Sequence, residues 1–228
     1  MKNQAIIFYG PPGAGKGTQA NILAKQNPTL IQFDTGSYLE KILHDPDNKN
    51  NKKLEAQKKL FDSGKLLDPP FVLKIINEQA KRIYKAGFGI IFSGSPRTEG
   101  EAFGIDKQPG LMKTLIDLYN KENILVLSIK IPLEESLRRN KVRLISPLLN
   151  MPVMSTTHKL KTSPFTGEPL VKRKALDNPE VIKERLEEYT NRTKPIEKQI
   201  KALGIKVKEI DGTDLPYKVF ERILKALK

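Results

Sequence analysis

A glycine-rich run near the N-terminus constrains this 228-residue chain more than any other feature. Residues 10–18 read Gly-Pro-Pro-Gly-Ala-Gly-Lys-Gly-Thr, directly after the apolar residues 5–9 and at the start of a helical pattern over 17–26. Glycines let main-chain N–H groups turn inward around phosphate oxygens, and a helix N-terminus adds its dipole. The run therefore predicts a phosphate-binding loop between a buried strand and a helix.

The residue types of this loop predict how it would bind a nucleoside triphosphate. Lys16 would reach the terminal phosphates, and the Thr18 hydroxyl would ligate Mg²⁺. The general form of such a loop has Ser or Thr directly after the lysine, whereas Gly17 separates Lys16 from Thr18 here. The residues expected to bind the triphosphate are Gly13, Ala14, Gly15, Lys16, Gly17 and Thr18.

Short apolar runs alternate with amphipathic stretches along the rest of the chain. Runs rich in β-branched or aromatic residues predict strands at 5–9, 30–33, 89–93, 124–129 and 205–210. Helical patterns lie near 17–26, 37–44, 52–62, 70–85, 110–121, 133–143, 179–202 and 215–227. The alternation predicts an α/β fold, a five-stranded parallel sheet flanked by helices, with ligands beyond the carboxyl ends of the strands.

Two segments interrupt this alternation. Residues 35–72 hold three helical patterns between the second and third expected strands, more than one crossover needs. Residues 144–172 are rich in Pro, Ser and Thr and show no long helical pattern, which is typical of a functional lid or a disordered loop. We favour a lid, which leaves residues 1–34, 73–143 and 173–228 as the core domain.

Composition is that of a globular protein, with 38% hydrophobic and 29% charged residues. No run approaches the roughly 18–20 apolar residues that cross a bilayer, and the N-terminus has no signal-peptide pattern. The chain has no cysteine, which excludes disulfides and thiolate metal sites. We therefore expect a cytoplasmic protein that does not associate with membranes.

The charge balance is strongly basic, with 40 Lys and Arg against 26 Asp and Glu, or +14. Such an excess indicates either a phosphate-rich partner or lysines spread over solvated helix faces. The lysines are scattered and form no long block, which favours the second interpretation. We expect a monomer that does not bind nucleic acid.

The glycine-rich loop resembles that of the nucleoside monophosphate kinases, and of the adenylate kinases most closely. Other segments resemble the same family in the same order, and together they span nearly the whole chain: Asp-Thr-Gly-Ser-Tyr-Leu at 34–39, Gly-Lys-Leu-Leu at 64–67, Ser-Gly-Ser-Pro-Arg-Thr at 93–98, Arg139, Arg143, Thr-Gly-Glu at 166–168, Arg173 and Arg-Leu-Glu-Glu-Tyr at 185–189. The resemblance implies a P-loop NTPase-type fold in which 35–72 binds a nucleoside monophosphate. It implies transfer of the γ-phosphoryl group of ATP to that monophosphate, AMP above others, with Mg²⁺.

The resemblance also implies roles for individual residues. The catalytic residues would be Lys16, Arg97, Arg143, Arg173 and Arg185, and Arg139 would stack on the donor base. The monophosphate would be bound by Thr35, Gly36, Leu67, Gly94, Arg97 and Glu101. Arginine suits this chemistry, because the transition state spreads charge over three oxygens and a guanidinium binds phosphate oxygens in pairs. The alternative for each arginine is a surface salt bridge.

The sequence departs from the family at positions near the metal and the acceptor phosphate. Ser93 stands where an aspartate usually organises water around Mg²⁺. Asp34 would either partly replace that carboxylate, acting through water, or only cap the following helix. Ser95 replaces a phenylalanine, and Glu40 replaces an arginine that binds the acceptor phosphate, with Lys41 as a substitute.

Glu101 stands where the family has a glutamine that recognises adenine. An ionised carboxylate only accepts hydrogen bonds, so Glu101 would favour GMP or CMP over AMP. The alternatives are that Glu101 points to solvent, or that the register is off by a residue, since Glu99 lies nearby. Three functions therefore remain open: a kinase for AMP, a kinase that prefers GMP or CMP, and a nucleotide-dependent binding protein with weak transfer.

The lid differs from that of the many adenylate kinases that hold zinc on two Cys-x-x-Cys pairs. Ser163 and Thr166 occupy the place of the second pair, and Ser155 and His158 are the candidates for the first. We expect no structural zinc, and a lid held by hydroxyl hydrogen bonds and by packing of Phe165.

Overall fold

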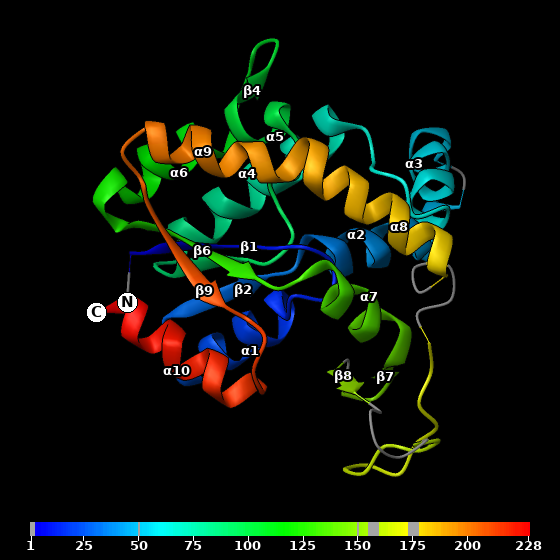
Figure 1. Cartoon of the computed structure of the whole chain (residues 1–228). Coiled ribbons are helices and arrows are strands. Elements are labelled where there is room, and N and C mark those ends of the chain that lie inside the picture. The colour runs from blue at the N-terminus through cyan, green and yellow to red at the C-terminus, as the bar shows by residue number, and fades with distance from the viewer. Residues whose placement is uncertain (1–2, 50, 150, 155–159, 173–177) are drawn as a thin grey trace.

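Five parallel strands form the centre of the molecule in a computed structural model that describes residues 3–49, 51–149, 151–154, 160–172 and 178–228 (Figure 1). The strands are β1 (Ala5–Tyr9), β2 (Leu30–Phe33), β3 (Gly89–Phe92), β6 (Ile124–Lys130) and β9 (Lys206–Asp211). They pair in the order β2-β3-β1-β6-β9, which confirms the predicted five-stranded parallel sheet. The loop after β1 therefore begins at the middle of the sheet, where the connections change sides, and this is where such sheets bind ligands.

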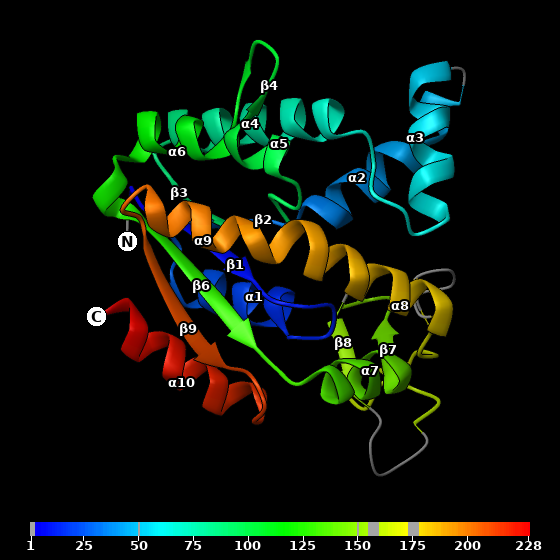
Figure 2. The ribbon, with the colours of Figure 1, turned by 45° about the horizontal axis from the view of Figure 1, so that its top comes forward.

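Helices cover both faces of the sheet. α4 (Pro69–Lys85), α6 (Leu111–Tyr119) and α9 (Lys194–Ala202) lie on one face, and α1 (Lys16–Gln26) and α10 (Pro216–Leu227) on the other (Figures 1 and 2). Successive side chains of β1 point to opposite faces of the sheet and pack against the helices on both faces. Ala5, Ile7 and Tyr9 belong to the first core cluster, whereas Ile6 and Phe8 belong to the second. Strands buried on both faces explain the continuous apolar runs in the sequence.

The segment between β2 and β3 carries α2 (Thr35–His44), a 3₁₀ turn (Pro46–Asn48), α3 (Lys52–Asp62) and α4. α2 begins two residues earlier than predicted, because Asp34 caps it: its Oδ1 accepts a hydrogen bond of 2.8 Å from the Ser37 N–H. α2 and α3 lean away from the sheet at one end of the molecule (Figure 2). The assignment of 35–72 as a separate segment stays a prediction.

A short helix and a hairpin follow β3, and the sequence did not predict them. They are α5 (Glu99–Phe103) and the antiparallel strands β4 (Gly104–Ile105) and β5 (Gln108–Pro109), which project outward (Figure 2). Both elements are shorter than the window over which a periodic pattern can be recognised.

The predicted helix over 179–202 is divided. It forms α8 (Pro179–Glu188), a π-helical turn (Tyr189–Thr193) and α9. Pro195 lies in the first turn of α9 and has no N–H to continue the α-helical hydrogen bonding, so the ladder is interrupted there.

The lid segment follows α7 (Leu133–Val142) and contains β7 (Arg143–Ser146) and β8 (Met151–Met154), which pair antiparallel. Further bridges join Ile145 to Val171 and Thr162 to Pro169. The boundaries 144–172 stay a prediction. Within the described ranges, no helix combines the length and apolar character that crossing a membrane requires.

Candidate active site

The phosphate loop folds around the first residue of α1. Lys16 Nζ donates hydrogen bonds to the carbonyl oxygens of Gly10, at 2.7 Å, and Pro11, at 3.0 Å. The Ala14 N–H also pairs with the Pro11 carbonyl, at 3.1 Å. The first turn of α1 contains no acidic residue, so no carboxylate there offsets the positive end of the helix dipole.

Helix α7 packs directly against this loop. Gly13 has φ of +84°, and a Cβ there would lie 2.6 Å from Asn140 Nδ2, so only glycine fits. Ser136 donates a hydrogen bond from its hydroxyl to the Pro12 carbonyl. The sequence analysis did not identify Ser136 or Asn140; the available signal was two polar residues four apart on one face of a helix, both of which are fully buried.

Three arginines gather around Lys16. The pKa of Lys16 is lowered to about 7, chiefly by burial. The charges of Arg97, Arg185 and Arg143 contribute to this shift, and the charge of Asp34 opposes it. The structure therefore brings together four of the five predicted catalytic residues; the fifth, Arg173, lies outside the described residues.

The Arg97 side chain lies across the ends of β2 and β3. Its Nε donates to the Gly94 carbonyl at 2.7 Å, and its Nη2 lies 3.4 Å and 3.9 Å from where a Cβ would stand on Gly94 and Gly36. The Arg97 carbonyl accepts a hydrogen bond of 2.9 Å from the Thr193 hydroxyl. The guanidinium therefore lies in van der Waals reach of both glycines.

A pocket opens beside these arginines. Residues from α2, α3, α4, α5, α8 and the connecting loops line it: Thr35, Gly36, Leu39, Phe61, Gly64, Lys65, Leu66, Leu67, Val72, Ser95, Arg97, Glu101 and Arg185. All the predicted monophosphate-binding residues except Gly94 are in this set. The Thr35 and Ser95 hydroxyl oxygens are buried and have no hydrogen-bond partner among the described residues, so a ligand could pair with both.

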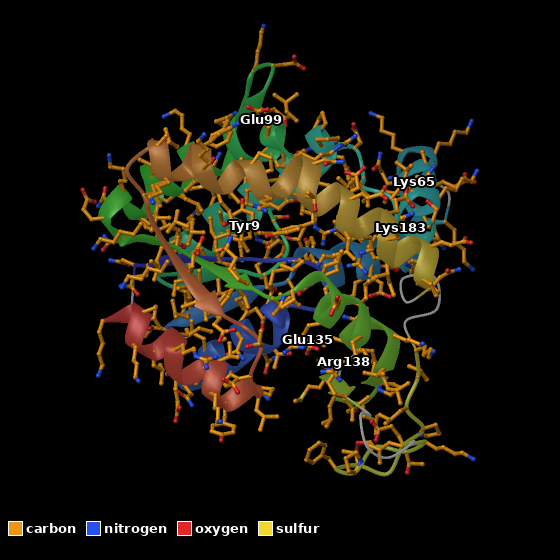
Figure 3. All side chains as sticks on the ribbon, in the orientation of Figure 1. Tyr9, Lys65, Glu99, Glu135, Arg138 and Lys183 are labelled. Carbon is orange, nitrogen blue, oxygen red and sulfur yellow. The ribbon has the colours of Figure 1, made fainter. Side chains whose placement is uncertain are left out.

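Glu101 is buried in the wall of this pocket, at 2% exposure. The alternative that it points to solvent is wrong, because its Oε2 accepts a hydrogen bond of 2.8 Å from the Arg97 N–H. Glu99 is the residue that faces outward (Figure 3), where it accepts from Gln199 Nε2 at 3.0 Å. Glu40 and Lys41 are exposed and do not line the pocket.

Arg139 lies on the other side of the phosphate loop. Its Nη2 donates to the carbonyl oxygens of Gly212, at 2.8 Å, and Thr213, at 3.1 Å, after β9. Its Nε donates to Glu135, whose pKa is lowered to about 2 chiefly by hydrogen bonds from Arg138, with Arg139 contributing (Figure 3). These bonds fix the plane of the guanidinium, as stacking on a donor base would require.

Comparison with known proteins adds to this geometry. The sequence profile described as "Adenylate kinase" matches residues 8–204. The chain is 31% identical to the adenylate kinase of Chlamydia pneumoniae over 226 residues, which are 99% of this chain and 98% of that protein. It is 30% identical to the adenylate kinase of Thermus thermophilus, over 98% of this chain and 97% of that protein.

The chain belongs to the adenylate kinase family. It is therefore a phosphotransferase. Family membership confirms the resemblance that the glycine-rich loop indicated, although the family profile by itself does not assign roles to the individual arginines.

This adenylate kinase family member has an acidic residue at the end of β2 instead of the end of β3. Asp34 Oδ2 accepts a hydrogen bond of 2.9 Å from the Ser93 hydroxyl, while Oδ1 caps α2. Oδ2 also lies 3.8 Å from where a Cβ would stand on Gly17, so the carboxylate is close to the phosphate loop. Among the described residues, no three His, Cys, Asp or Glu side chains gather as a metal site would require.

In the segment expected to form the lid, hydroxyl groups gather around Ser163, which is 4% exposed. The Ser163 Oγ accepts from two main-chain N–H groups, of Phe165 and Thr166, each at 3.3 Å, and pairs with the Thr166 hydroxyl at 2.9 Å. The Glu168 carboxylate accepts from the Thr166 and Ser146 hydroxyls. Ser146 thus contributes from the first lid strand, a position that the sequence analysis missed.

One part of the lid prediction was wrong. Phe165 does not pack inside the lid; it is 76% exposed. The hydrogen bonds to Ser163 turn the chain tightly at this point and direct the aromatic ring outward. The candidate pair Ser155 and His158 lies outside the described residues.

Proposed function

We propose that this protein transfers the γ-phosphoryl group of ATP to AMP and forms two molecules of ADP. The observation that carries the proposal is the position of Arg97 and Arg185. Both line the acceptor pocket, and the charges of both lower the pKa of Lys16 in the phosphate loop. They therefore lie between the two places where phosphates would bind.

The donor phosphates would be held by the loop from Gly13 to Thr18. Phosphoryl transfer has a loose transition state with charge on three oxygens, so positioned cations are the main catalytic need. Lys16, Arg97, Arg143 and Arg185 supply four, and we expect Arg173 to add a fifth. Arg139 would hold the donor base beside Gly212 and Thr213, whose carbonyls it already binds.

Mg²⁺ would accompany ATP, and the residues present fit it. Magnesium prefers hard oxygen ligands and keeps several waters. Thr18 would offer its hydroxyl directly, and Asp34 would bind a water of the ion. Each Asp34 oxygen accepts one hydrogen bond within the protein and keeps a lone pair. The ion would neutralise charge on the β- and γ-phosphate oxygens.

The inserted segments would complete the two sites. Residues 35–72 supply most of the acceptor pocket, and 144–172 would cover the transferring phosphoryl group. We infer a monomer, because one chain supplies residues to both substrate sites; light scattering of the purified protein would test this.

A panel assay tests the function. ATP would be offered with AMP, GMP, CMP or UMP, and ADP formation followed over many turnovers. Lys16→Ala is expected to lower kcat/KM by about a hundred- to a thousandfold or more. Lys25→Ala, which removes an exposed lysine of the same helix, is the matched control. Nucleotide binding without multiple turnover would instead favour the nucleotide-dependent binding protein.

A further inference from the structure

The acceptor pocket contains a single carboxylate among the described residues that line it. Lys65, Arg97 and Arg185 carry positive charge and suit a phosphate, whereas Glu101 carries the opposite sign. A carboxylate in this position would repel a phosphate. Glu101 is therefore suited to another part of the acceptor.

The orientation of Glu101 is set by the first turn of α5. Its N–H pairs with the Thr98 hydroxyl oxygen at 3.2 Å, and its Oε2 accepts from the Arg97 N–H at 2.8 Å. The Thr98 side chain also hydrogen-bonds to the Glu101 carboxyl group. The Arg97 main chain thus holds Oε2 as an acceptor and fixes the carboxyl group at the wall of the pocket.

Apolar side chains complete this part of the pocket. Leu39, Phe61 and Val72 line it together with Glu101. A flat aromatic ring with polar atoms on its edge fits such surroundings, because the apolar walls contact its faces while a carboxyl group pairs with its edge.

We propose that the protonation state of Glu101 sets which acceptor base this protein prefers. The inference rests on the proposed function and deepens it. A neutral carboxyl has one donor and one acceptor, as an amide does, whereas a carboxylate only accepts.

The hydrogen-bond pattern follows from the Arg97 contact. In the neutral form Oε2 is the carbonyl, accepting from Arg97 and from the adenine amino group, while Oε1 donates to adenine N1. In the ionised form both oxygens accept, and they match the N1–H and 2-amino donors of guanine. A mismatched buried group disfavours the wrong base by about ten- to a hundredfold.

The surroundings favour a neutral form at higher pH than usual. Burial raises the pKa of Glu101, and the Arg97 N–H, the Arg97 charge and Thr98 oppose this shift only in part. Tyr9 of β1 interacts electrostatically with Glu101. The pKa of Tyr9 is raised chiefly by burial, and further by the charges of Glu101 and Glu197. The remaining charged groups that line the pocket are Lys65 and Arg185.

The test compares AMP with GMP in the wild type, in Glu101→Gln and in Glu99→Gln. The wild-type ratio of kcat/KM, AMP over GMP, is expected to fall by about tenfold or more as pH rises through the Glu101 pKa. Glu101→Gln should favour AMP at every pH. Glu99→Gln, which changes the exposed neighbour, should behave as the wild type.

Binding without catalysis gives a second readout. Calorimetry with AMP or GMP, in two buffers of different ionisation enthalpy, counts the protons taken up. In the wild type, binding of AMP should take up more protons than binding of GMP. The phosphate group contributes equally in both cases, so the difference reports on the base. The proposal would be overturned if, in the wild type, the AMP/GMP ratio of kcat/KM did not change with pH and proton uptake did not differ between the two bases. It would also be overturned if the Glu101→Gln variant kept both of these dependences. If the wild type transferred no phosphoryl group but still took up protons on binding to an extent that depends on the base, only the proposed function would be overturned.

Discussion

The Ser93 hydroxyl donates a hydrogen bond of 2.9 Å to Asp34 Oδ2, joining the ends of two neighbouring strands. Asp34 therefore both caps α2 and faces the phosphate loop, so the two roles that the sequence left open are compatible. We expect Asp34→Asn to raise the Mg²⁺ concentration needed for half-maximal rate by about tenfold. Asparagine still caps the helix, so the free energy of unfolding should change little. An unchanged magnesium titration would leave capping as the only role of Asp34.

The depressed pKa of Lys16 predicts that ATP binding takes up a proton. Above a pH of about 7, Lys16 in the free protein is mostly neutral, whereas bound phosphates favour its charged form. The affinity for ATP should therefore fall as pH rises above this value, by at most about tenfold per pH unit. Calorimetry at about pH 8 should detect close to one proton per ATP bound. Lys16→Gln should abolish the uptake, and Lys25→Gln should retain it; uptake that persists in Lys16→Gln would assign it to another group.

The contact between Gly13 and Asn140 predicts a specific coupling. Gly13→Ala should lower the free energy of unfolding through its positive φ, by about 1–2 kcal/mol, and further through the contact with Asn140. Gly15→Ala is the matched control, since Gly15 has φ of +91° but a Cβ added there would meet no atom within 4 Å. In urea unfolding, Asn140→Ala should recover part of the Gly13→Ala loss and none of the Gly15→Ala loss. If the losses caused by Gly13→Ala and Asn140→Ala simply add, the loop relaxes around the added methyl group and the contact with Asn140 costs nothing.

The lid should keep its order without metal. Ser163→Ala removes the acceptor of two main-chain hydrogen bonds and the partner of the Thr166 hydroxyl, so hydrogen exchange of the neighbouring amides should become faster. Phe165→Ala removes an exposed ring and should leave the exchange unchanged. Purified protein should contain well under one zinc per chain, and a chelator should not alter the exchange. Stoichiometric zinc whose removal disorders the lid would contradict this.

Local chemistry allowed much of the fold to be predicted. The bounds expected for the strands at Ala5–Tyr9 and Leu30–Phe33 agree with the structure, because an apolar run between turn residues is a local signal. The phosphate loop was equally local, since the glycines and Lys16 act through their own backbone and through the adjacent helix. The family resemblance depended on the same short motifs.

Other features depended on contacts between distant segments. The break at Tyr189–Thr193 and the hairpin at 104–109 were not predicted, and Phe165 faces solvent instead of the lid interior. Whether Glu101 pointed outward or into the acceptor pocket depended on the hydrogen bond to the Arg97 main chain. The sequence by itself determined which residue types could bind phosphate and where strands and helices lie. Only the tertiary structure decided which of those side chains meet, because a few ångströms of packing between α5, α7, α8 and the sheet set their distances.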